Sequence, residues 1–238
     1  MKQLKQWSYS GLKTFEACPQ HAYLRKHGSV REESGPAAER GTEIHQIAED
    51  YVAGKLDETP PPQLEKFSRE FRELRERFSA GDVILEERWG FTHEFNPCTW
   101  EDRDVLWLRS ALDVFVRENK TDALVIDHKT GQRFGNELAH STQLQLYTIC
   151  AFEKFLELEH ITAQCWYLDK GGKLEKSYTR AEAAIFTPRW VNRALKMTTA
   201  TEFPTRASAY NCKWCHFKDN ICPAYNGENN TTLMVSER

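Results

Sequence analysis

Opposite charges end a hydrophobic run in ALVIDHKTG, residues 123–131, where Asp127 and Lys129 stand two positions apart. Side chains alternate along a strand, so these two share one face, while His128 points the other way and offers that face only its backbone carbonyl. Carboxylate and carbonyl oxygens suit Mg²⁺ or Mn²⁺, and a neighbouring ammonium could orient a water or balance phosphate charge. The pattern alone more often marks a solvated strand end with a salt bridge, because short motifs match often by chance.

A second carboxylate, Asp113, is expected opposite Asp127. The runs SALDVFVRE and ALVIDHK flank NKTD, residues 119–122, a turn-rich tetrapeptide that predicts an antiparallel hairpin. With the turn centred near Lys120, the two aspartates lie equally far from it and face each other across the ladder. Like charges in that position are destabilising unless something compensates them, and a divalent cation is such a compensator.

The elements that must position these residues follow from hydrophobic spacing. Apolar side chains at steps of three and four predict helices, and alternating or continuous apolar runs predict strands. The expected helices span residues 8–17, 37–53, 64–78, 141–158 and 187–197, the last with Pro188 in its first turn. The expected strands lie within residues 83–91, 105–118, 123–131, 161–169 and 171–179. A loop is expected between the first two helices, to about residue 36, and Gly81 is expected to stop the third helix.

Two of these helices carry further polar candidates. His45 lies on the second, and Gln143 and Tyr147 lie at i and i+4 on the fourth. Each alone is more often structural, as a buried histidine or a hydrogen-bonded pair on a helix face. In chain order, however, GTEIH, ALD, IDHKTG and QLQLY resemble the four motifs of the PD-(D/E)XK nuclease superfamily, and within it the RecB-like branch.

The resemblance covers residues 8–225 and implies a restriction-endonuclease-like α/β core, with a mixed central sheet flanked by helices. It implies that four groups hold a Mg²⁺ or Mn²⁺ ion: His45, Asp113, Asp127 and the backbone carbonyl of His128. It also implies that Lys129 helps to activate water, and that Gln143 and Tyr147 support the lysine and the DNA backbone. One position departs from the family, because the middle of the third motif, often tyrosine, is His128.

Four of the seven cysteines form a second candidate site: Cys18, Cys212, Cys215 and Cys222. The last three form a C-x2-C-x6-C run, and four thiolates hold either zinc or an iron–sulfur cluster, between which the spacing does not choose. With SYSGLKTFEACP around Cys18, the split arrangement resembles the iron–sulfur subset of RecB-like nucleases, which includes AddB and CRISPR-associated exonucleases. That resemblance implies a 4Fe–4S cluster, with zinc as the alternative, in a module that joins the two ends of the chain. The remaining cysteines, Cys98, Cys150 and Cys165, are expected to be small core residues.

Composition sets the wider limits. The chain has 238 residues, 40% apolar and 28% charged, which is typical of a globular protein. A formal net charge of -3 argues weakly against a simple electrostatic coat for DNA but leaves a local basic groove open. No apolar run is long enough to span a membrane and no signal peptide is visible, so we expect no membrane partner and a cytoplasmic location.

The expected organisation has four parts: an N-terminal segment with the first cluster cysteine (1–36), a nuclease core (37–200), a cysteine segment (201–225) and a flexible tail (226–238). The expected activity is a metal-dependent DNA exonuclease acting on single strands or ends, for which the family suggests 5'–3' polarity. One alternative is a nuclease subunit of a recombination or CRISPR spacer-acquisition complex. The other is a catalytically silent scaffold that binds DNA ends, against which the complete set of motif residues argues.

Overall fold

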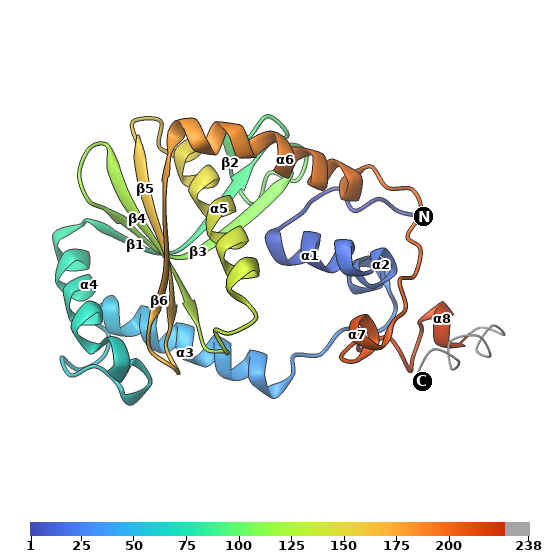
Figure 1. Cartoon of the computed structure of the whole chain (residues 1–238), viewed down its shortest axis with the longest axis horizontal. Helices are drawn as coiled ribbons and strands as arrows, with labels where there is room; N and C mark the ends of the chain where they lie inside the picture. The colour runs from blue at the N-terminus through green and yellow to red at the C-terminus, as the bar shows by residue number, and fades with distance from the viewer. Residues whose placement is uncertain (227–238) are drawn as a thin grey trace. The chain divides into compact units, whose positions relative to one another are not determined.

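The computed structural model describes residues 1–226 and divides into two compact units (Figure 1). Unit 1 joins the two ends of the chain, Met1–Ser34 and the segment that begins at Val191, while unit 2 is the continuous stretch Gly35–Trp190. Of the predicted tail at 226–238, all but Asn226 lies outside the described residues. In residues 1–226, no helix is both long and apolar enough to cross a membrane.

Unit 2 is built on a six-stranded sheet with the order β2-β1-β3-β4-β5-β6. Only β4 and β5 pair in parallel, and the other neighbours are antiparallel, so the sheet is mixed. The prediction of an α/β core around a mixed sheet is confirmed. The strands are β1 (Val83–Phe91), β2 (Pro97–Cys98), β3 (Leu108–Arg117), β4 (Asp122–Lys129), β5 (His160–Tyr167) and β6 (Lys173–Thr179).

The hairpin of β3 and β4 has the predicted register, from Arg117 opposite Ala123 to Val114 opposite Ile126. Its turn is closed by Asn119, whose side-chain oxygen accepts hydrogen bonds from the backbone N–H of Thr121 at 2.8 Å and of Asp122 at 3.0 Å. An asparagine that bonds the backbone two and three residues on fixes a tight turn. The local sequence NKTD thereby sets which residues of the two strands face each other.

Helices cover both faces of this sheet (Figure 1). On one face, α3 (Pro36–Val52), a 3₁₀ helix η1 (Pro62–Phe67) and α4 (Ser68–Ala80) form a buried cluster with strand residues such as Val114 and Ile126. The neighbouring Phe115 points the other way and stacks on Phe155 at the end of α5 (Glu137–Lys154), with ring centroids 4.7 Å apart. The alternation along β3 therefore separates two apolar layers.

Helix boundaries are less well predicted than the strands. The helix expected at 64–78 is divided into η1 and α4, which ends at Gly81 with a left-handed φ of 89° as expected. α5 begins four residues before the predicted start of its helix (137 against 141). α6 (Arg180–Thr198) begins earlier than 187, so Pro188 lies in its interior and not in its first turn. The helix starts at this earlier point because the Glu182 carboxylate accepts a hydrogen bond from the N–H of Thr179 at 2.7 Å and caps the first turn.

Unit 1 contains α1 (Tyr9–Ala17), which begins with Ser8 as its N-cap, as predicted. The loop expected after Cys18 is wrong, because Pro19–His27 form a second helix, α2. Proline fits the first turn of a helix, where its missing N–H is not needed, and this helix buries Ala22 and Leu24. Two short helices follow near the C-terminal end, α7 (Ala209–Cys212) and α8 (Pro223–Asn226).

Candidate active site

Acidic residues on three adjacent strands form a row across the sheet of unit 2. The β1–β3 ladder pairs Leu85 with Val114 and Glu87 with Leu112, which leaves Glu86 opposite Asp113. The β3–β4 register, continued by one residue beyond Val114, places Asp113 opposite Asp127. Side chains that are opposite each other in a ladder lie on the same face. Two of these three acids, Asp113 and Asp127, were predicted candidates.

His45, on α3, joins the first part of this row. Its Nδ1 lies 3.3 Å from Oδ1 of Asp113. Ligand atoms of His45, Glu86 and Asp113 all lie within 4.8 Å of one another, and within residues 1–226 this is the one group of histidine, cysteine or acidic residues gathered so closely. The group is a candidate site for a metal ion.

Asp113 is held by hydrogen bonds on both of its oxygens. Its Oδ2 accepts the backbone N–H of His128 at 2.6 Å, while Oδ1 faces His45. Burial raises the pKa of Asp113, but the hydrogen bond and charge of His45, together with the contact with His128, leave the pKa lowered. Burial lowers the pKa of His45, and the same contact with Asp113 leaves it raised. Asp113 is therefore an ionised carboxylate whose position is fixed by strand β4 and helix α3.

Asp127 and Lys129 form a separate buried pair. The Lys129 ammonium lies 2.5 Å from Oδ2 of Asp127, whose residue is 2% exposed. Burial raises the pKa of Asp127 in spite of that ammonium. Burial alone would lower the pKa of Lys129, but the charge of Asp127 raises it. The lysine is consequently a charged donor, held at the carboxylate by alternation along a single strand.

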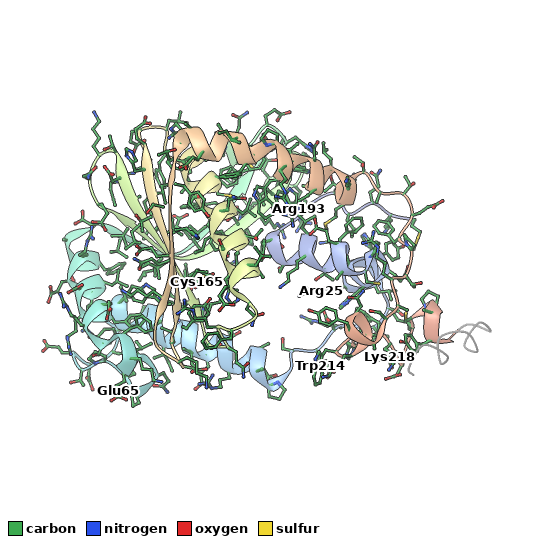
Figure 2. The ribbon with its side chains drawn as sticks, in the orientation of Figure 1. Arg25, Glu65, Cys165, Arg193, Trp214 and Lys218 are labelled. Carbon is green, nitrogen blue, oxygen red and sulfur yellow. The ribbon has the colours of Figure 1, made fainter. Side chains whose placement is uncertain are left out.

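The row continues one strand further, where Asp127 stands opposite Cys165 of β5. The thiol of Cys165 donates to Oδ2 of Asp127 at 3.4 Å, and Figure 2 labels this side chain at the sheet. Cys165 was predicted to be a small core residue, and it is fully buried. It also supplies one of the polar contacts that orient Asp127.

His128 points to the opposite face, as alternation predicts. Its ring lies 5.3 Å from Phe71 and 5.7 Å from Trp166, between centroids, within the apolar layer of α3 and α4. Burial lowers its pKa to about 4, and within the described chain its Nε2 has no hydrogen-bond partner. The imidazole is therefore neutral and packs as an aromatic ring of the apolar layer.

Gln143 and Tyr147 lie one turn apart on α5, and the Gln143 amide donates to the Tyr147 hydroxyl at 2.7 Å. Burial raises the pKa of Tyr147, and the charges of Asp127 and Asp113 raise it further. The phenol is therefore protonated and lies within electrostatic reach of both carboxylates. The structure brings residues of all four motifs together around Asp113 and Asp127.

The residue that sequence reasoning missed is Glu86. Glu86 is an exposed residue, yet partial desolvation by the surrounding protein, followed by the charge of Asp113, raises its pKa to about 7. The only signal in the sequence is a pair of glutamates in the middle of the apolar run VILEERWGF. That signal gains meaning only when the β1–β3 register is known, because the register places Glu86 rather than Glu87 opposite Asp113.

In unit 1, the four cysteines predicted to act together line one cavity: Cys18, Cys212, Cys215 and Cys222. Burial raises the pKa of Cys215, and the other three thiols raise it further. The backbone N–H of Arg206 donates to the Cys18 sulfur at 3.4 Å. The cavity therefore joins a cysteine from the beginning of the chain to three from its end.

The family model of the PD-(D/E)XK nuclease superfamily matches residues 6–223. The chain belongs to this superfamily. Nucleases of the superfamily use divalent metals, and the donor set of His45, Glu86 and Asp113 fits such an ion, since imidazole nitrogen and carboxylate oxygen both bind divalent cations.

Two solved structures are similar to this chain, and the likeness to the first shows a shared fold. The crystal structure of SSO0001 shares 17% identity, with 94% of this chain and 89% of that chain covered and a TM-score of 0.51. A structure from Eubacterium rectale that bears the name "Putative exonuclease" shares 14% identity, with 89% and 86% covered and a TM-score of 0.47. No curated protein matches the chain.

Proposed function

We propose that this PD-(D/E)XK protein is a metal-dependent DNA exonuclease that hydrolyses phosphodiester bonds on single strands or at DNA ends. The observation that carries the proposal is the convergence of His45, Asp113, Asp127 and Lys129 on neighbouring strands and the helix α3 beside them. Action on ends and 5'–3' polarity rest on the resemblance of the sequence to the iron–sulfur subset of the RecB-like branch.

The proposed ligands of Mg²⁺ or Mn²⁺ are His45, Asp113, Asp127 and the backbone carbonyl of His128. When bound, the ion supplies polarisation of the phosphate and a lowered pKa for the attacking water. Asp113 contributes a carboxylate that is already ionised and oriented by the His128 N–H. An ion bound between His45 and Asp113 would replace their direct contact at Oδ1, while the His128 N–H keeps Oδ2 in position.

Lys129 and Tyr147 are the proposed donors to water and phosphate. Lys129 has three N–H donors, and only part of that capacity is used by Asp127. The Tyr147 hydroxyl accepts from Gln143, which leaves its own proton available to an oxygen of the substrate. A cationic donor and a neutral donor beside a phosphate stabilise the charge that develops during hydrolysis.

We propose further that Cys18, Cys212, Cys215 and Cys222 hold a 4Fe–4S cluster. The cavity that they line supports one shared site. Four thiolates suit either a zinc ion or an iron–sulfur cluster. The choice of a cluster rests on the resemblance of the sequence around Cys18 and of the C-x2-C-x6-C run to the iron–sulfur subset of RecB-like nucleases.

The test combines composition with activity. We expect protein purified anaerobically to contain iron and sulfide, and to degrade end-labelled single-stranded DNA with Mg²⁺ or Mn²⁺ but not with EDTA. Asp113→Asn should lose cleavage, whereas Asp104→Asn, an exposed acid, should keep it. DNA binding without cleavage under every metal condition would instead support the silent scaffold. Cleavage that requires added recombination or CRISPR adaptation proteins would support the subunit hypothesis.

A further inference from the structure

Glu86 differs from the other residues of β1 in its pairing and in its backbone conformation. The ladder with β3 pairs every residue of Val83–Phe91 except Glu86. Its backbone has a φ of 48°, in the left-handed region that glutamate rarely adopts. From this position its carboxylate comes within 4.8 Å of the ligand atoms of His45 and Asp113. The side chain thus joins a group whose other members come from α3 and β3.

The protein compensates the negative charge of Asp127 directly, but it does not compensate the charges of Glu86 and Asp113 in the same way. Asp127 has the Lys129 ammonium at 2.5 Å. In the described chain, neither Glu86 nor Asp113 forms a salt bridge with a lysine or an arginine, and the basic partner of Asp113 is His45. Like charges opposite each other in a ladder are destabilising. Two carboxylates and an imidazole that converge, within the described residues, without a salt bridge to an ammonium or a guanidinium form a donor set suited to a divalent cation.

We infer that Glu86 is a ligand of the active-site cation, an inference that rests on the proposed metal-dependent nuclease function. The four sequence motifs supply ligands from α3, β3 and β4, and none of them includes β1. Glu86 adds an oxygen ligand from that fourth element, on the side of Asp113 away from Asp127. The cation is then held by carboxylates from three neighbouring strands, β1, β3 and β4, and by an imidazole from α3.

Binding of Mn²⁺ to the metal-free full-length protein, measured by calorimetry, tests this inference without reference to activity. Glu86→Gln keeps the size of the side chain and removes its charge. We expect the affinity for Mn²⁺ to fall by at least about tenfold, and the rise in melting temperature on adding Mn²⁺ to shrink. The matched control is Glu87→Gln, since Glu87 pairs with Leu112 rather than Asp113. It should bind Mn²⁺ like the wild type.

The outcomes separate the inference from the function on which it rests. If the wild type neither binds Mn²⁺ nor cleaves DNA, the proposed function fails. If the wild type binds and cleaves while Glu86→Gln binds with unchanged affinity and stoichiometry, the inference alone fails. Glu86→Asp, which keeps the carboxylate on a shorter side chain, should retain part of the affinity. Thermal melting in EDTA verifies that the variant is folded. In EDTA, Glu86→Gln should be at least as stable as the wild type, because it removes one of two negative charges that face each other.

Discussion

The two candidate sites are built in different ways. In unit 2, Asp113 and Asp127 lie on paired strands whose register is fixed by backbone hydrogen bonds, and Lys129 follows on the same strand. In unit 1, Cys18 stands between two helices and the other cysteines lie in short helices and turns near the end of the chain. In unit 2 the pairing of two strands holds the residues in place, whereas in unit 1 the cysteines are brought together from distant parts of the chain.

The largest effect is expected from breaking the cysteine cavity. Cys18→Ala removes one of four thiolates, and the binding free energy of a structural metal site, on the order of 10 kcal/mol, is coupled to folding. We expect loss of iron from the purified protein and a melting temperature lower by more than about 10 °C. Cys98→Ala is the matched control, because Cys98 lies outside this cavity. A Cys18→Ala protein with full iron content and wild-type melting would contradict the four-cysteine site.

Asp113→Asn should break the other site with little effect on folding. The amide oxygen of asparagine can still accept the His128 N–H, so the hairpin keeps its hydrogen bond. The negative charge that binds the cation is lost, and we expect nuclease activity to fall by at least about 10²-fold. Circular dichroism and single-turnover cleavage measure the two effects separately. Unchanged cleavage would remove Asp113 from the site.

Lys129→Ala sharpens the distinction between ligand and donor. Lysine cannot bind the cation, so Mn²⁺ binding should remain detectable while cleavage falls by about 10²-fold. The variant leaves the Asp127 carboxylate buried without its partner, which should destabilise the metal-free protein by about 3 kcal/mol. Added Mn²⁺ should then stabilise this variant more than the wild type. Loss of Mn²⁺ binding in calorimetry would show that the lysine organises the ligands themselves.

The smallest effect concerns His128, which separates the carboxylate row from the apolar layer. Its pKa is lowered by burial from 6.5 to about 4. Between these values the unfolded chain binds a proton that the folded chain does not, so stability is complete above pH 6.5 and falls as the pH drops toward 4. At pH 5 the loss through this residue is about 2 kcal/mol.

His128→Phe should remove that loss, because phenylalanine does not titrate and fits the same aromatic surroundings. Denaturant unfolding of both proteins at pH 7 and pH 5 provides the measurement. The difference in stability between the two pH values should be smaller in the variant by about 2 kcal/mol. Equal pH dependence in both proteins would mean that His128 is not buried as a neutral side chain.

The sequence predicts the carboxylate hairpin well because its determinants are local. NKTD sets the turn, and the turn sets the pair Asp113 and Asp127. Glu86 was missed because its position depends on pairing between β1 and β3, which no tight turn connects. The same limit applies to zinc against iron–sulfur. Spacing along the chain groups the cysteines, but four thiolates suit either metal centre.

Unit 2 is continuous in sequence while unit 1 joins both ends of the chain, and this predicts an order of folding. A β-hairpin forms in about 1–10 μs, so the two strands that carry Asp113 and Asp127 can pair early and locally. Bringing Cys18 to Cys212 closes almost the whole chain, with a correspondingly larger entropy cost and a slower approach. During synthesis, moreover, Cys18 must wait for the last cysteines to be made. The cysteine cavity is therefore expected to close last, after unit 2 has folded.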